Sequence, residues 1–239
     1  MMKVSGIIVA AGKGRRMGLG KNKAFLDLNG KPLLIHTLSR WQQFNCITEL
    51  TVVVGKEDLN LVQELVKQHG LSKVSQVVTG GKERQESVFL GLQAAGKSKP
   101  DIVLIHDGAR PFVTEEHVGQ LVDAVQQHEA GVLAVPVKDT IKVATNGLIE
   151  KTLERSRLWA AQTPQGFRYG LIMEAHQQAR RENREATDDA ALVEAMGRAV
   201  YIVPGSEYNI KLTTPEDIEL ARSILKRSEE HDDANRTGL

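Results

Sequence analysis

The chain of 239 residues is long enough for one large α/β core, and 31 Lys and Arg residues nearly balance 30 Asp and Glu residues, for a formal charge of +1. This balance gives no overall field that would attract the chain to nucleic acid or to an anionic membrane. The apolar runs are too short to span a membrane, the N-terminus lacks a signal-peptide core, and Cys46, the single cysteine, excludes an internal disulfide. We therefore expect a cytoplasmic protein with no nucleic acid or membrane partner.

The segment from Val4 to Gly18 predicts a strand that ends in a phosphate-binding loop. The strand is expected at Ile7–Ala10, because a short apolar run that stops at glycine is typical of a buried strand. Ala10, Ala11 and Gly12 follow, and such small residues leave backbone N–H groups uncovered for a ligand. The segment then provides Lys13, Arg15 and Arg16, and Lys21 and Lys23 follow just beyond it. So many cations suit a triphosphate. A glycine-rich surface loop with solvated charges is the alternative.

The glycine spacing of this loop argues against a dinucleotide. Gly12, Gly14 and Gly18 give GxGxxxG, which is one residue longer than the dinucleotide fingerprint, and no helical period follows directly. A nucleoside triphosphate is therefore expected rather than NAD.

Apolar runs and helical periods alternate along the chain. Further strands are predicted at Leu50–Val54, Val74–Val78, Ile102–Ile105, Gly131–Val135 and Ala199–Val203. Apolar stripes at helical spacing lie between most of them, for example Val118, Leu121, Val122 and Val125. This alternation predicts an α/β fold, a Rossmann-like, mostly parallel and twisted sheet with helices on both faces.

Polar residues follow two of the central strands, at the sheet edge where open α/β sheets bind their ligands. After Val74–Val78 come Gly80 and Gly81, and Ser87 lies on the first turns of the next helix. These residues suit contacts with a base or ribose. After Ile102–Ile105 comes Asp107, which is well placed to hold Mg²⁺ near phosphates. The alternative is a structural ion pair between Asp107 and Arg110.

Residues 137–157 interrupt the α/β pattern. The sequence there alternates around Asn146-Gly147, which is a strong signal for a two-residue hairpin. We expect an inserted β-arm within a single domain of residues 1–227. Because an isolated hairpin is only marginally stable, the arm is expected to pair with a second subunit, and a solvent-exposed flap is the alternative.

Three further segments carry polar groups. Thr163-Pro164-Gln165 is a candidate site segment or an ordinary turn, and Thr187-Asp188-Asp189 is a candidate site segment or a helix N-cap. Asn209-Ile210-Lys211 adds a cation before the last helix, which is predicted to begin at Pro215 after the capping Thr214.

Residues 228–239 lack an apolar period and are expected to form a disordered tail.

These features together indicate nucleotidyl transfer. A phosphate oxygen of an acceptor attacks the α-phosphorus of a nucleoside triphosphate, and pyrophosphate leaves. The protein has to position the reactants and neutralise charge, and no nucleophilic side chain is needed.

From about Val4 to Leu225 the chain resembles the 2-C-methyl-D-erythritol 4-phosphate cytidylyltransferase family. The matching motifs occur in the family's order: AAGKGRRM, Lys23 followed by AFL, GGKERQESV, HDGARP, VKDTIK, RSRLWAAQTPQGF, TDDAA and NIKLTTPEDI. The resemblance implies a nucleotidyltransferase fold and Mg²⁺-dependent transfer of a cytidylyl group from CTP to a sugar-alcohol phosphate, a step of the non-mevalonate isoprenoid pathway.

The resemblance also implies roles for individual residues. Catalysis would involve Arg16, Lys23 and Lys211, and Asp107 would engage the metal. The nucleotide would contact Ala10, Ala11, Gly12, Gly81 and Ser87. The acceptor would contact Arg110, Thr163 and Thr187, together with Thr140 and Arg155 from the arm of the neighbouring subunit in a homodimer.

Two other functions remain open from the sequence. The first is ribitol-5-phosphate cytidylyltransferase, which shares the fold, the nucleotide and the metal. The second is a nucleotide-binding protein that performs no transfer, which the presence of Lys23, Asp107 and Lys211 disfavours.

Overall fold

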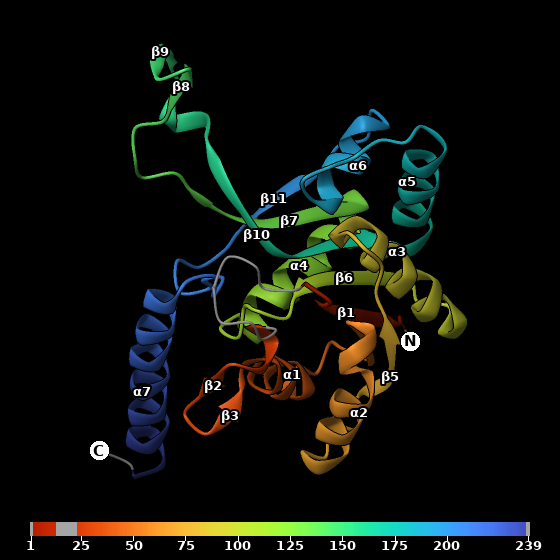
Figure 1. Ribbon diagram of the computed structural model, residues 1–239, viewed down its shortest axis with the longest axis vertical. Coiled ribbons are helices and arrows are strands. Elements are labelled where there is room, and N and C mark those ends of the chain that lie inside the picture. The colour runs from red at the N-terminus through yellow and green to blue at the C-terminus, as the bar shows by residue number, and fades with distance from the viewer. Residues whose placement is uncertain (1, 13–22, 238–239) are drawn as a thin grey trace.

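The computed structural model describes the backbone of residues 2–12 and 23–237 and the side chains up to Lys226 of the last helix. A seven-stranded sheet forms its centre, with the strand order β11-β7-β10-β6-β1-β4-β5 (Figure 1). The strands span β1 Val4–Ala10, β4 Glu49–Val54, β5 Val74–Thr79, β6 Ile102–Asp107, β7 Ala130–Pro136, β10 Trp159–Arg168 and β11 Tyr201–Pro204. Two short strands, β2 Asp27–Leu28 and β3 Lys31–Pro32, pair separately. The predicted α/β class with a mostly parallel sheet is confirmed.

Helices cover both faces of the sheet. They span α1 Leu33–Gln43, α2 Leu59–Gln68, α3 Arg84–Ala95, α4 Glu115–His128, α5 Tyr169–Arg181, α6 Asp189–Ala195 and α7 Pro215–Thr237. One buried cluster joins α1, α2 and α4 to one face, and another joins α3, α5 and α6 to the other. Strand β1 contributes to both, since Ile8 belongs to the first cluster and Ile7 to the second. This two-sided burial explains the continuous apolar run Ile7–Ala10 within the strand.

Strand β10 is a strand that the sequence analysis did not predict. It runs antiparallel to β6 and to β7 and therefore breaks the parallel order of the sheet. The pairing with β7 is irregular between Ala161 and Gln165, where the Thr163-Pro164 peptide bond is cis. Pro164 within this segment favoured a turn in the sequence, since proline has no N–H to donate to a neighbouring strand. Because the ladder is interrupted at this point, the proline is accommodated.

The inserted segment forms a hairpin of β8 Lys142–Thr145 and β9 Leu148–Thr152, which stands away from the central sheet (Figure 1). Its turn is at the expected dipeptide, where Asn146 has φ 51° and Gly147 has φ 83°. Leu148 and Ile149 on β9 are 76% and 65% exposed in the single chain. The short helix η5 Arg155–Arg157 leads from the hairpin into β10.

The C-terminal segment differs from its prediction. Helix α7 begins at Pro215 as expected, and the Asp217 carboxylate accepts the backbone N–H of Thr214 at 2.8 Å. The helix then continues to Thr237, through residues for which a disordered tail was expected. The first turns pack through Ala221, which is buried, and a helix that has already formed extends at low cost, since each added residue gains one hydrogen bond. None of the described helices is long and apolar enough to cross a membrane.

Candidate active site

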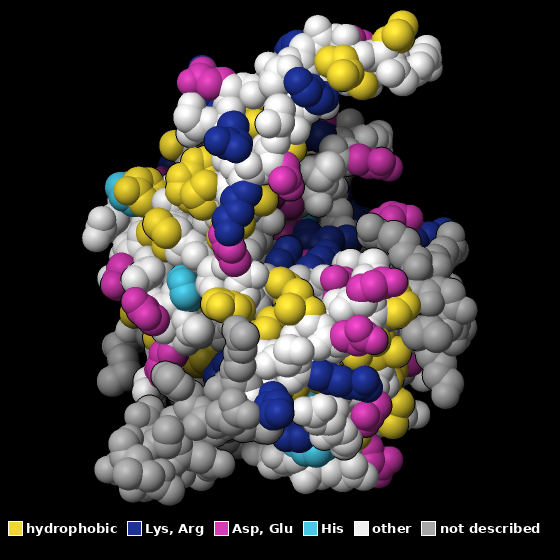
Figure 2. Space-filling view, turned by 90° about the vertical axis from the view of Figure 1, so that its left-hand side faces the viewer, with side chains coloured by type: hydrophobic (Ala, Val, Ile, Leu, Met, Phe, Trp, Pro, Cys, Tyr) yellow, Lys and Arg dark blue, Asp and Glu magenta, His cyan; other side chains and the backbone are white. Residues whose placement is uncertain are grey.

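A cleft of about 910 Å³ opens at the carboxyl ends of β1, β4, β5 and β6. Parallel strands direct these ends to one edge of the sheet, so segments far apart in the sequence meet there. The cleft is lined by Ala10–Gly12, Lys23, Gly55–Glu57, Gly80–Ser87 without Gln85, Asp107–Ala109, Lys211 and Thr213. In Figure 2, Lys and Arg side chains gather in a hollow between the hairpin and the body of the molecule.

The residues predicted to contact the nucleotide line this cleft. The Ser87 hydroxyl accepts the backbone N–H of Gly81 at 3.1 Å and donates to the Glu83 carbonyl at 3.0 Å, so it holds the loop after β5 in place. The loop also lies close to the first strand. A Cβ atom on Gly80 would be 2.6 Å from the Ala11 side chain, which explains the need for glycine there.

Asp107 lies among three cations at the end of β6. Lys211 Nζ is 2.6 Å from its Oδ2, Arg84 Nε is 3.4 Å from its Oδ1, and Arg110 Nε is 3.8 Å from its Oδ2. Burial by itself would raise the pKa of Asp107, but the charges of Lys211, Arg84 and Arg110 hold it well below its ordinary value. At this point of the cleft three cations therefore surround one carboxylate, and this local excess of positive charge suits an anionic ligand.

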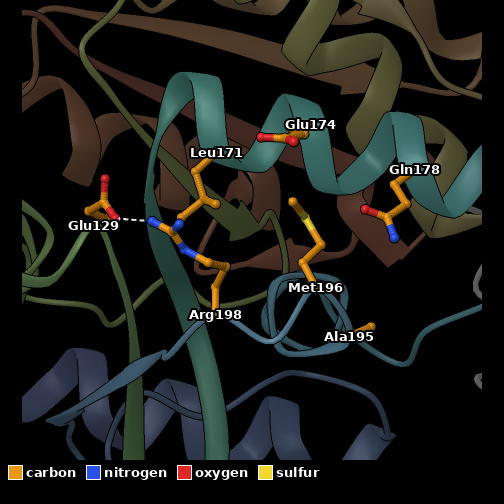
Figure 3. A pocket seen from close by; sticks show the side chains of 7 residues that line it. All are labelled: Glu129, Leu171, Glu174, Gln178, Ala195, Met196 and Arg198. Carbon is orange, nitrogen blue, oxygen red and sulfur yellow. Dashed lines mark hydrogen bonds and ion pairs between the residues drawn. The ribbon is translucent and has the colours of Figure 1, made fainter.

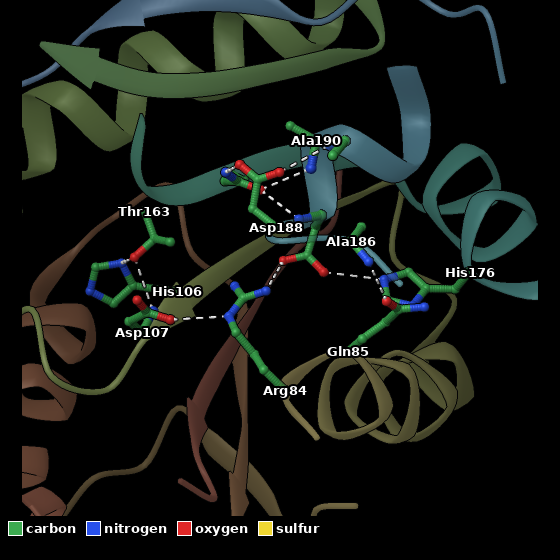
Figure 4. A network of polar contacts seen from close by, with 12 residues as sticks. Arg84, Gln85, His106, Asp107, Thr163, His176, Ala186, Asp188 and Ala190 are labelled. Atoms are coloured by element: carbon green, nitrogen blue, oxygen red, sulfur yellow. Dashed lines mark hydrogen bonds and ion pairs between the residues drawn. The ribbon is translucent and has the colours of Figure 1, made fainter. Parts of the chain in front are cut away.

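Arg84 connects Asp107 to a buried carboxylate (Figure 4). Its Nη1 donates to Asp189 Oδ2 at 2.8 Å, and His176 Nε2 lies 3.2 Å from Asp189 Oδ1. Burial lowers the pKa of Arg84, but Asp189 and Asp107 raise it above its ordinary value. Burial raises the pKa of Asp189, but Arg84 and His176 bring it below its ordinary value. Arg84 and Asp189 therefore form a charged pair inside the protein.

Thr163 and Arg110, both predicted to contact the acceptor, are held by the surrounding structure. The Thr163 hydroxyl accepts the backbone N–H of Asp107 at 3.0 Å and lies 3.2 Å from His106 Nδ1. Arg110 Nη1 donates to the Asn209 carbonyl at 2.7 Å. Burial lowers the pKa of His106 to about 4, so this histidine is neutral at pH 7.

The remaining predicted residues lie elsewhere. Thr187 is exposed directly before Asp188, whose side chain caps α6 by accepting the Ala191 N–H at 3.0 Å. Thr140 and Arg155 are exposed in the arm segment and do not line the cleft of their own chain. Arg155 Nη1 donates to the Lys138 carbonyl at 2.7 Å. Arg16 lies outside the described residues.

Several site residues were missed from the sequence. Arg84 lies within the motif GGKERQESV but received no role, and Lys56 follows β4 at the same edge of the sheet. A consistent use of the strand-end rule would have found Lys56. Asp189 was interpreted as one residue of a possible N-cap segment, and the sequence contains no signal that pairs it with Arg84 or His176.

A phosphate-loop pattern, GxxxxGKS, also occurs at Gly91–Ser98. It lies in α3 and the following turn η4 Gly96–Ser98, and a Cβ on Gly91 would be 2.8 Å from side chains of Ile7 and Val53. The Ser98 hydroxyl bonds to Glu49 and to the Ala95 carbonyl. Because η4 precedes β6, it lies at the edge of the sheet opposite the cleft. Here Gly91 is required for packing.

Another hollow, of about 550 Å³, lies beside α5 and α6 (Figure 3). Glu129 pairs with Arg198 at its rim, and Glu174, Leu171 and Met196 contribute to its lining. The paired charges and the second glutamate provide no excess of cations. This hollow therefore does not suit a triphosphate.

Comparisons with known proteins point to one family. The family described as 2-C-methyl-D-erythritol 4-phosphate cytidylyltransferase matches residues 4–227. A relative of that name from Halalkalibacterium halodurans is 48% identical over 228 residues, covering 95% of this chain and 99% of its own. Another from Geobacillus kaustophilus is 48% identical over 225 residues, covering 94% and 97%.

Solved structures agree with these relatives. The structure of 4-diphosphocytidyl-2C-methyl-D-erythritol synthase from Anaerococcus prevotii has a TM-score of 0.83 at 30% identity and covers 94% of this chain and 96% of its own. A 2-C-methyl-D-erythritol 4-phosphate cytidylyltransferase from Thermus thermophilus has a TM-score of 0.73 at 33% identity, with 92% and 98% covered.

Proposed function

The chain belongs to the 2-C-methyl-D-erythritol 4-phosphate cytidylyltransferase family, and we propose that it transfers the cytidylyl group of CTP to 2-C-methyl-D-erythritol 4-phosphate in isoprenoid precursor biosynthesis. A phosphate oxygen of the acceptor forms a bond to the α-phosphorus of CTP, and the bond to the leaving pyrophosphate breaks. The products are 4-diphosphocytidyl-2-C-methyl-D-erythritol and pyrophosphate. The observation that carries this proposal is the cluster of Lys211, Arg84 and Arg110 around Asp107 in the cleft.

Lys211, Lys23 and Arg16 are the proposed catalytic residues. Lys211 lines the cleft, and we assign it to the α-phosphate, where negative charge increases as the new bond forms. Lys23 also lines the cleft, and with Arg16 it would stabilise the leaving pyrophosphate. Since the reaction requires no covalent intermediate on the protein, positioning and charge stabilisation account for catalysis.

Cytidine would lie against the loop after β1 and the loop after β5. Both consist of small residues at the cleft, Ala10, Ala11 and Gly12 in the first and Gly81 in the second, so their backbone groups can approach a base or ribose. The Ser87 hydroxyl is already bonded within the second loop. Its contribution to nucleotide binding is therefore to shape the loop.

The acceptor would bind beside Arg110, Thr163 and Thr187. We propose that Thr140 and Arg155 of a second subunit complete this site in a homodimer. Two features of the arm support this assembly: its exposed apolar residues, Leu148 and Ile149, and the absence of Thr140 and Arg155 from the lining of their own chain's cleft. A small-molecule reaction of this kind is expected in the cytoplasm.

Magnesium is the proposed cofactor. Among the described residues no group of three or more His, Cys, Asp or Glu side chains could hold a metal ion. Asp107 is nevertheless a suitable ligand, because Mg²⁺ is commonly held by one or two carboxylates together with substrate phosphates and water. Asp107 would hold the ion after Lys211 leaves its Oδ2, and the metal would neutralise charge on the triphosphate.

Pyrophosphate release with CTP tests the proposal. The purified protein is supplied with Mg²⁺ and either 2-C-methyl-D-erythritol 4-phosphate or ribitol 5-phosphate, with EDTA as the control. We expect metal-dependent release with the first acceptor alone. Release with the second alone would move the chain to the ribitol-5-phosphate enzyme, and CTP binding without release in either case would indicate a nucleotide-binding protein.

A further inference from the structure

A chain of charged and polar side chains leads from the cleft into the protein interior. It passes from Asp107 at the end of β6 to Arg84 at the start of α3, then to Asp189 at the start of α6 and His176 on α5 (Figure 4). Asp189 is 1% exposed and His176 is fully buried. Charges buried this deeply are costly to maintain, so their arrangement needs an explanation.

Arg84 divides its donors between the two carboxylates. Its Nε faces Asp107 and its Nη1 faces Asp189. No acceptor among the described side chains lies on its Nη2, the guanidinium side chain is 30% exposed, and it lines the cleft. A guanidinium has five N–H groups in a rigid plane, so these remaining donors are available to a phosphate oxygen.

His176 determines how Arg84 contacts Asp189. An ionised carboxylate can only accept, so His176 Nε2 is the nitrogen that donates to Asp189 Oδ1 at 3.2 Å, and Nδ1 is buried without a partner among the described residues. With Oδ1 occupied by His176, Arg84 contacts Asp189 through Oδ2 alone. Without His176, both carboxylate oxygens would accept from the guanidinium, since arginine favours a bidentate contact with a carboxylate. Arg84 would then turn toward Asp189 and away from Asp107.

Hydrogen bonds from Gln165 to the backbone also hold Asp189 in place. Gln165 Oε1 accepts the N–H groups of Asp189 and Ala190 at 3.0 Å each, and Gln165 Nε2 donates to Asp188 Oδ2 at 2.7 Å. Gln85, next to Arg84 in the first turn of α3, holds the segment just before α6, because its side-chain carbonyl accepts the Ala186 N–H at 3.1 Å. The first turn of α3 thereby joins the cleft to the segment that contains Thr187.

We propose that Arg84 donates to a phosphate group of a substrate in the cleft, and that Asp189 and His176 are positioning residues that keep its guanidinium directed there. This inference rests on the proposed cytidylyl transfer. The phosphate belongs either to CTP or to the acceptor, and the two sources share the same chemistry.

Steady-state kinetics with both substrates test the proposal. We expect Arg84→Gln to lower kcat/KM at least about tenfold, since a displaced positioning group costs up to about 10²-fold. A larger rise in the KM for CTP would assign the phosphate to the nucleotide, and a larger rise in the KM for the acceptor would assign it to the acceptor. Inorganic pyrophosphate provides a readout besides turnover, because its inhibition constant should rise in Arg84→Gln if the nucleotide is the source.

Variants of His176 separate positioning from packing. His176→Leu should lower kcat/KM at least about fivefold, whereas His176→Gln, which retains a donor, should stay within about threefold of the wild type. The double variant Arg84→Gln/His176→Leu should be no slower than Arg84→Gln alone, because residues that act through one another are not additive. Ile172→Ala, a buried change on the same helix, should lower the Tm without this kinetic effect.

The outcomes distinguish this inference from the proposed function. A wild-type protein that is inactive with both substrates would overturn the proposed function itself. An active wild type with an Arg84→Gln variant of equal kcat/KM would overturn the role of Arg84. The Tm of this variant is measured as well, because the change removes one partner of the buried Asp189. Additive losses in the double variant would overturn the role of His176.

Discussion

Replacement of Lys211 provides the most direct test of the proposed chemistry. Its Nζ lies 2.6 Å from Asp107 Oδ2 and its side chain is 35% exposed, so it is a partly exposed cation at the wall of the cleft. Lys211→Ala removes this charge and leaves Arg84 and Arg110 on Asp107. The carboxylate therefore stays ionised, and the variant reports on the missing cation alone.

The size of the effect follows from the geometry. At an effective dielectric constant of about 20, two unit charges about 4 Å apart interact by roughly 4 kcal/mol. Solvent exposure and the partial development of charge on the α-phosphate reduce this to about 2.7 kcal/mol, which corresponds to about a 10²-fold lower kcat. Because the contact tightens in the transition state, CTP affinity should fall less than about fivefold.

The assay measures kcat by pyrophosphate release at saturating substrates, and calorimetry measures the Kd for CTP. Lys97→Ala is the matched control, because it removes the same charge from an exposed turn outside the cleft. An equal loss in both variants would show a general charge effect. A rise in Kd that accounts for the whole loss of kcat/KM at unchanged kcat would refute the assignment of Lys211 to the transition state.

Four further results are expected. Mixed chains carrying Arg155→Ala or Lys23→Ala, each inactive alone, should regain part of the pyrophosphate release, because one site of a mixed dimer then has both residues. Deletion of Ser228–Leu239 should leave the release rate unchanged, since the contacts of α7 among the described residues come from its earlier turns. The free energy of unfolding in urea should fall as the pH drops below about 4, because the native pKa of Asp189 is lower than that of the unfolded chain and this stabilisation is lost on protonation. Gly91→Ala should lower the same free energy by about 1–3 kcal/mol, since its Cβ would lie 2.8 Å from two side chains.

Each expectation has a contrary result. No recovered activity after confirmed subunit exchange would count against a shared site, and a large loss of activity on truncation would give the end of α7 a functional role. An Asp189→Asn variant with the same acid dependence as the wild type would exclude Asp189 as the source of that dependence. A Gly91→Ala variant with an unchanged free energy of unfolding would show that the side chains of Ile7 and Val53 shift to accommodate the added methyl group.

Local rules were sufficient for several elements. The two-sided burial of β1 appears as the apolar run Ile7–Ala10, proline at the first helical position marks the start of α7, and Asn146-Gly147 adopts the positive φ angles that its hairpin turn needs. Each depends on residues next to one another in the chain. The missed strand β10 lacks such a signal, because its partners β6 and β7 lie far away in the sequence.

The sequence alone determined the fold class, the family and the edge of the sheet at which the cleft opens, because strands, helices and motifs each consist of residues that are contiguous in the chain. Only the tertiary structure decided which charges meet. Arg84 and Asp189 are 105 residues apart, and Asp107 and Thr163 are 56 apart, yet both pairs are bonded. The ionisation and direction of these side chains depend on burial and on neighbours that folding brings together, and no local pattern specifies them.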